Sequence, residues 1–136
     1  MALDIQERER EGIVVLDLSG KLIVGESVSD LREKIRELVA ASKINIVLNL
    51  QNLDYIDSTG LGGLVIGYTT AKKAGGAMKI VNLSQRNIEL LVLTKLTTVF
   101  EVYADEQDAV NSFFPNRQIR KFDILDFVQK QKPPER

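Results

Sequence analysis

The residues best suited to chemistry lie between positions 53 and 63, where the sequence reads Leu-Asp-Tyr-Ile-Asp-Ser-Thr-Gly-Leu-Gly-Gly. Ser58 follows a strongly apolar strand pattern and precedes a helical pattern, so we expect it at the N-terminus of a helix. Such a strand–helix junction lies at the carboxyl end of a strand, where open α/β sheets bind their ligands. A phosphate on Ser58 would meet the positive end of the helix dipole and its free N–H groups. The segment therefore favours a phosphorylation switch, with a plain N-cap role for Ser58 as the structural alternative.

Four glycines crowd the start of this expected helix, at positions 60, 62, 63 and 67. Each glycine in a helix lowers its stability by up to about 1 kcal/mol relative to alanine. We therefore expect the four glycines to provide a packing or binding advantage that offsets this loss. Either the helix packs very closely on its neighbours, or another molecule approaches its first turn. We expect Gly60 and Gly62 to face a partner and Gly67 to allow close packing.

The composition argues against an enzyme. The chain has neither histidine nor cysteine, which removes the usual general base, the commonest zinc ligand and any thiolate nucleophile. A nucleophile elbow requires glycine where the chain has Ile56, and a dinucleotide loop requires glycine where it has Val65. Asp54 and Asp57 alone offer too few oxygens for a calcium or magnesium site. We therefore expect no catalytic residue, no metal and no cofactor.

Length and charge indicate one domain that binds neither membranes nor nucleic acids. The 136 residues are 44% hydrophobic and 27% charged, which suits a single folded domain. No apolar run reaches the ~20 residues that span a bilayer, and the first residues lack a signal-peptide core, so we expect a cytoplasmic protein. Residues 1–114 carry 12 basic and 16 acidic side chains, a balance that disfavours binding to nucleic-acid phosphates.

The periodicity predicts an α/β fold, in the order β-β-α-β-α-β-α-β-α, with a mixed, mostly parallel sheet of about five strands and about four helices. Strands are expected near residues 3–5, 13–18, 44–50, 78–81 and 99–103. Helices are expected over 27–39, 58–74, 84–92 and 105–113, mainly on one side of the sheet. The first strand should lie at an edge, and Gly20 should end the second. Ser27 with Asp30 resembles a capping box, and Ser84 and Asp105 are expected N-caps.

Pro115-Asn116 predicts the end of the domain, which divides the chain into 1–114 and a C-terminal extension, 115–136. In the extension, apolar residues recur every three positions, which fits a short amphipathic helix; they are Ile119, Phe122, Leu125 and Val128. A tail docked on its own domain, or disordered, is an equal alternative. Pro133-Pro134 predicts a disordered end.

The stretch from Ile46 to Gly62, with its core Asp-Ser-Thr-Gly-Leu-Gly, resembles the STAS domain of bacterial anti-sigma factor antagonists. The resemblance continues through residues 75–82 and 102–109 in the right order and spacing. It implies that the unmodified protein binds an anti-sigma factor serine kinase and so frees a sigma factor. The kinase would then phosphorylate Ser58 and end the complex, and a PP2C-type phosphatase would restore it.

The resemblance also implies a docking surface at the end of the sheet. That surface would comprise Asp57, Ser58, Thr59, Gly60, Leu61 and Gly62, with Lys21, Ile23, Gly25 and Ser84 from neighbouring loops. Lys21 and Ile23 stand where the family commonly has acidic residues, which bears on the choice of partner. Other interpretations are a STAS scaffold in a stress-sensing or transporter-associated complex, and a weak nucleotide binder. A homodimer is left open.

Overall fold

The computed structural model describes residues 2–119, 122 and 124. β1 (Leu3–Arg10) and β2 (Ile13–Leu22) form an antiparallel hairpin. Glu11 and Gly12 turn the chain between them with φ angles of 53° and 82°, the left-handed geometry that two-residue hairpin turns favour. β1 lies at the edge of the sheet, as the sequence predicts.

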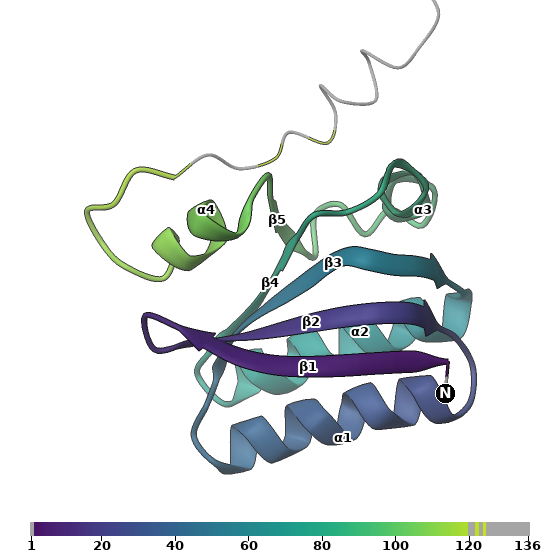
Figure 1. Ribbon diagram of the computed structural model, residues 1–136. Coiled ribbons are helices and arrows are strands. Elements are labelled where there is room, and N and C mark those ends of the chain that lie inside the picture. The colour runs from purple at the N-terminus through teal and green to yellow at the C-terminus, as the bar shows by residue number, and fades with distance from the viewer. Residues whose placement is uncertain (1, 120–121, 123, 125–136) are drawn as a thin grey trace, which may run out of the picture.

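Helices and strands alternate along the rest of the chain (Figure 1). The elements are α1 (Glu26–Ala40), β3 (Asn45–Ile56), α2 (Ser58–Lys73), β4 (Ala77–Val81), α3 (Gln85–Leu93), β5 (Glu101–Tyr103) and α4 (Glu106–Asn111). The strands lie in the order β1-β2-β3-β4-β5, and β2 to β5 are parallel. The α/β class, the mixed five-stranded sheet and the four helices of the described residues confirm the prediction. Within those residues, no helix has the length and apolarity needed to cross a bilayer.

The two faces of the sheet are covered by different helices. On one face, side chains of β2, β3 and β4 pack against α1, α2 and α3; they include Leu16, Leu48, Ile80, Leu31, Leu64 and Leu91. On the other face, a smaller cluster that contains Val47 and Tyr103 packs against residues of α4. Right-handed crossovers between strands in sequential order place their helices on the same face. The expectation that the helices lie mainly on one side is therefore confirmed.

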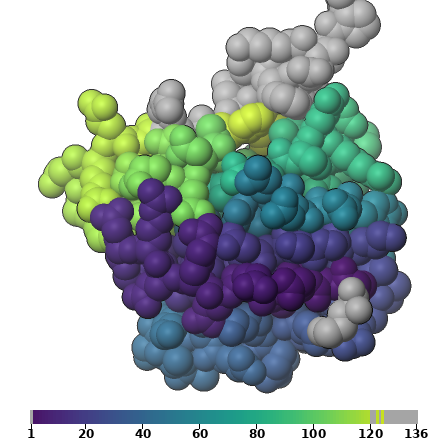
Figure 2. All heavy atoms as spheres, in the orientation of Figure 1, coloured from purple at the N-terminus to yellow at the C-terminus, as the bar shows by residue number. Residues whose placement is uncertain are grey.

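Ion pairs fasten α4 to the N-terminal hairpin. Arg8 donates hydrogen bonds to both Asp17 and Glu106, and Arg10 donates to Glu106 at 2.6 Å. Asp17 also accepts from Asn49 of β3 at 2.8 Å. Figure 2 shows the hairpin, in purple, and the green segment that contains α4 side by side. Bonding to Arg8 is the main reason that the pKa values of Asp17 and Glu106 are lowered.

The end of β2 differs from the prediction because its glycine forms a bulge. β2 continues through Gly20 to Leu22 instead of ending at the glycine. Gly20 has a φ of +97° at a shift in the β2–β3 register. A Cβ on this residue would lie 2.2 Å from the Ala2 carbonyl oxygen. The glycine is required for this close approach, and the strand does not end there.

The start of α1 also differs from the prediction. Its N-cap is Gly25, which makes no side-chain capping bond. The expected capping serine, Ser27, is buried and bonds the backbone of the preceding loop instead. Its Oγ accepts from Ile23 N at 2.9 Å and donates to Ile23 O at 2.7 Å. Ser27 therefore shapes the loop between β2 and α1 instead of capping the helix.

Part of the C-terminal extension packs on the domain. Phe122 N donates to Val102 O of β5 at 3.1 Å. Ile124 is 8% exposed and belongs to the main core cluster. Most of the helix expected around 119–128 falls on residues outside the described part, and the boundary at 114/115 stays a prediction. These two contacts agree with a tail that is docked on its own domain.

Candidate functional site

Asp57, rather than Ser58, caps the helix that carries the candidate site. Asp57 has extended backbone geometry, and its Oδ1 accepts from Gly60 N at 2.7 Å. This carboxylate satisfies one of the free N–H groups of the first turn. Ser58 is therefore the first residue of α2, and it is exposed. The capping role expected for Ser58 is wrong, and its hydroxyl is left at the surface.

The same carboxylate joins α2 to the loop between β2 and α1. Asp57 Oδ2 accepts from Val24 N at 2.9 Å, and Asp57 N donates to Leu22 O at 3.2 Å. The N–H groups of Val24 and Gly60, in that order of effect, hold the pKa of Asp57 below its ordinary value. The side chain is therefore a carboxylate at neutral pH, beside the Ser58 hydroxyl. Both oxygens of this carboxylate accept from backbone N–H groups.

One glycine of α2, Gly60, has a different role from the one expected. Gly60 is buried, and a Cβ on it would lie 2.1 Å from Leu22 O. Gly62 is exposed, and a Cβ there would meet no atom within 4 Å. Gly67 packs against Ile35, as expected, since a Cβ would lie 2.5 Å from the Ile35 side chain. The absence of a side chain at Gly60 thus serves the fold, and Gly62 is the bare position at the surface.

The remaining predicted site residues divide into exposed and buried positions. Thr59 is exposed next to Ser58, whereas Leu61 is 4% exposed and belongs to the core. The Leu61 side chain therefore cannot be the surface contact that we expected. At the end of β2, Lys21 is exposed, and in the loop that follows, Gly25 is exposed and Ile23 is half-buried. Their part in docking stays a prediction.

Two features of the site could not be found from the motif alone, namely the exposed Val24 side chain and the contact between Arg86 and Tyr55. Val24 is 67% exposed, and its backbone N–H is bonded to Asp57, so this apolar side chain lies beside the tip of α2. Its signal in the sequence is only an apolar residue at the end of a strand pattern. Ser84 is exposed and caps α3, accepting from Asn87 N at 3.1 Å. The Arg86 guanidinium stacks on the Tyr55 ring, 4.6 Å from its centroid, which brings α3 against the end of β3.

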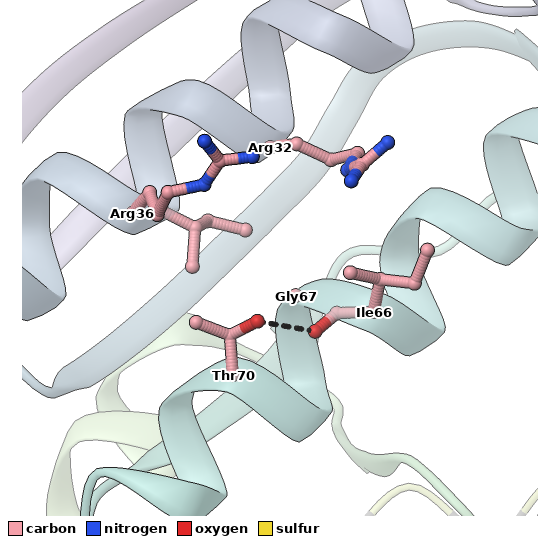
Figure 3. Close-up of a pocket in the computed structure, with 6 residues that line it drawn as sticks. Arg32, Arg36, Ile66, Gly67 and Thr70 are labelled. Atoms are coloured by element: carbon pink, nitrogen blue, oxygen red, sulfur yellow. Dashed lines mark hydrogen bonds between the residues drawn. The ribbon is translucent and has the colours of Figure 1, made fainter.

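A small cavity of about 100 Å³ lies between α1 and α2, farther along the helix from Ser58 (Figure 3). Arg32 and Arg36 line it from α1, and Ile66, Gly67 and Thr70 line it from α2. The Thr70 hydroxyl donates to Ile66 O at 2.8 Å and so does not point a free donor into the space. The cavity shares no residue with the surface around Ser58.

Known proteins match both the sequence and the fold. The sequence pattern of the STAS domain matches residues 4–109. The chain is 32% identical over 110 residues to the anti-sigma-B factor antagonist of Bacillus subtilis (strain 168), covering 81% of this chain and 99% of that protein. It is 30% identical over 112 residues to the anti-sigma F factor antagonist of Paenibacillus polymyxa, covering 81% and 94%.

A solved structure extends the likeness to the fold. The Bacillus cell fate determinant SpoIIAA in its phosphorylated form superposes with a TM-score of 0.63 at 21% identity, covering 82% of this chain and 100% of that one. At this identity the likeness concerns the fold alone. The family match spans most of the chain, and both sequence relatives are covered nearly from end to end. The chain belongs to the STAS domain family.

Proposed function

We infer that this protein is an anti-sigma factor antagonist, which binds an anti-sigma factor serine kinase through the surface around Ser58 and is released when Ser58 is phosphorylated. Two sequence relatives are antagonists of anti-sigma factors by name, and a protein of the same fold is described in a phosphorylated form. The observation that carries the proposal is the exposed Ser58 hydroxyl at the first position of α2.

The surroundings of Ser58 suit a contact that a phosphate would end. Exposed residues of this surface include the small or apolar Thr59, Gly62 and Val24. A partner can approach these positions closely because their side chains are short or absent. A phosphate adds nearly two negative charges and three acceptor oxygens next to the Asp57 carboxylate. The same partner surface would then face bulk and concentrated negative charge.

The helix itself should tolerate the modification. Gly60 N is bonded to the Asp57 side chain and Leu61 N to the Asp57 carbonyl, but the N–H groups at the first two positions of a helix have no carbonyl partner within it. A phosphate on the first residue would meet those groups and the positive end of the helix dipole. The switch therefore needs no unfolding of α2, and it acts through charge and shape at the surface.

Incubation with the cognate kinase and ATP, followed by peptide mass spectrometry, tests the proposal. We expect a single phosphate on Ser58, removable by a PP2C-type phosphatase. Thr59→Ala is the matched control, since it removes the neighbouring hydroxyl and should still be phosphorylated. In calorimetric titration, Ser58→Ala should bind the kinase and Ser58→Asp should not. A phosphate found only at another residue, or equal affinity of the two variants, would contradict the proposal.

A further inference from the structure

The chain continues beyond the matched STAS domain, and the continuation packs back on it. The match to the Bacillus subtilis antagonist covers 99% of that protein but 81% of this chain. Beyond the domain, Arg117 donates to Glu11 of the hairpin turn at 3.0 Å. Farther along, Phe122 N donates to Val102 O of β5 at 3.1 Å. We call residues 117–124, which include both of these contacts, the strap.

The strap borders α3. Phe122 lines a cavity of about 60 Å³ together with Leu83, in the loop before α3, and Ile88 of the helix itself. Ile124 is buried in the core cluster that also contains Ile88 and Leu91. The strap is therefore part of the wall that surrounds α3.

α3 itself is loosely packed. It has nine residues, and its buried apolar side chains are Ile88 and Leu91. A second cavity, of about 230 Å³, opens between the helix and the end of β3, at Tyr55 and Ile56. The two cavities share no lining residue, so α3 lacks close packing in two separate places. An element with few buried apolar contacts has low local stability.

We infer that α3 is a movable element whose position is controlled by the strap, and the consequence for binding rests on the proposed function. Ser84 caps α3 and belongs to the predicted docking surface, so a shift of α3 carries Ser84 with it. When the strap is docked, Phe122 limits the space into which α3 can move. When the strap is released, α3 shifts, and a smaller fraction of the molecules presents the complete docking surface. The segment beyond the domain thereby regulates the affinity for the anti-sigma factor kinase.

Hydrogen exchange of the free, full-length protein tests the control of α3. Phe122→Ala removes the ring that lines the cavity beside Ile88, and the backbone N–H groups of α3 should then exchange about tenfold faster than in wild type. Arg117→Ala, which releases the strap from Glu11, should act in the same direction to a smaller extent. Wild-type exchange of α3 in both variants would overturn the inference.

Val110→Ala is the matched control, because Val110 is fully buried in α4 on the opposite face of the sheet. This variant should lower the melting temperature and speed exchange in the central strands, while exchange in α3 stays at the wild-type rate. Equal acceleration of α3 and β3 in this variant would show that α3 opens only together with the whole domain. That result would also overturn the inference.

Calorimetric titration with the cognate anti-sigma factor kinase tests the consequence for binding. Phe122→Ala should bind about threefold more weakly than wild type, because the apparent affinity falls with the fraction of molecules in which α3 is in place. Val110→Ala should bind like wild type at a temperature where it is fully folded. Faster exchange of α3 together with wild-type affinity would overturn the regulatory role. A wild-type chain that does not bind the kinase would refute the proposed function, and the exchange rates would still decide whether the strap holds α3.

Discussion

Replacement of Gly60 by alanine, compared with the same change at Gly62, tests whether the glycines of α2 serve folding or docking. A Cβ on Gly60 would lie 2.1 Å from the backbone oxygen of Leu22, whereas a Cβ on Gly62 would meet no atom within 4 Å. The Leu22 carbonyl belongs to a strand and cannot rotate away as the end of a flexible side chain can. In the Gly60 variant, α2 itself must therefore shift.

The magnitudes follow from packing and from helix propensity. An extra methyl group forced into a packed contact lowers the free energy of unfolding by about 1–3 kcal/mol. We expect Gly60→Ala to lie near the upper end of this range because its new methyl group would meet a backbone atom. Replacement of glycine by alanine in a helix also raises the free energy of unfolding, by up to about 1 kcal/mol. Gly60→Ala should therefore lower the free energy of unfolding by about 2 kcal/mol, and Gly62→Ala should raise it by about 0.5–1 kcal/mol.

Urea unfolding followed by circular dichroism measures both variants against wild type. With a slope of about 1–3 kcal/mol per molar urea, the two midpoints should differ by about 1 M or more. Binding to the kinase, measured on the same samples at low temperature, shows whether Gly62 has a separate role at the surface. Equal stability of the two alanine variants would refute the packing argument and return Gly60 to the docking surface.

Three further predictions concern the cap, the ion pairs and the C-terminal segment. Asp57→Ala should lower the urea midpoint because two backbone N–H groups lose their acceptor, and Asp57→Asn, which keeps one oxygen, should fall between this variant and wild type. The lowered pKa values of Asp17 and Glu106 stabilise the fold at neutral pH, and this contribution is lost as the pH falls through the folded-state values. Thermal melts between about pH 6 and about pH 2 should therefore decline more steeply for wild type than for Asp17→Asn. Ile124→Ala should cost about 2 kcal/mol in urea unfolding, and unchanged stability would show that this contact does not support the domain.

The order of the elements could be predicted because it depends on local periodicity. Apolar residues recur at helical spacing in α1, and β-branched residues fill β2 and β3, so each segment indicates its own structure. The edge position of β1 follows likewise from its alternating pattern. The bulge at Gly20 could not be predicted, because a glycine in a strand pattern marks either an end or a close approach of two backbones. Only the position of Ala2 distinguishes the two.

At the candidate site, the sequence located the motif but not the roles within it. Asp57 and Ser58 are both good N-cap residues, and local sequence gives no reason to prefer one. The bond from Val24 N to Asp57 favours the aspartate, and that bond depends on a loop more than 30 residues earlier in the chain. The consequence is chemical, since the serine hydroxyl is left exposed.

The amino-acid sequence by itself determined the α/β alternation, the position of the serine and glycine motif at a strand–helix junction, and the absence of histidine and cysteine chemistry. These properties belong to residue types and their spacing. The tertiary structure decided which glycine lies at the surface without contacts, which residue caps α2, and that the buried Asn87 Nδ2 donor has no acceptor among the described residues. Such properties depend on contacts between segments distant in sequence, because a side chain is buried or exposed only once the other elements are in place.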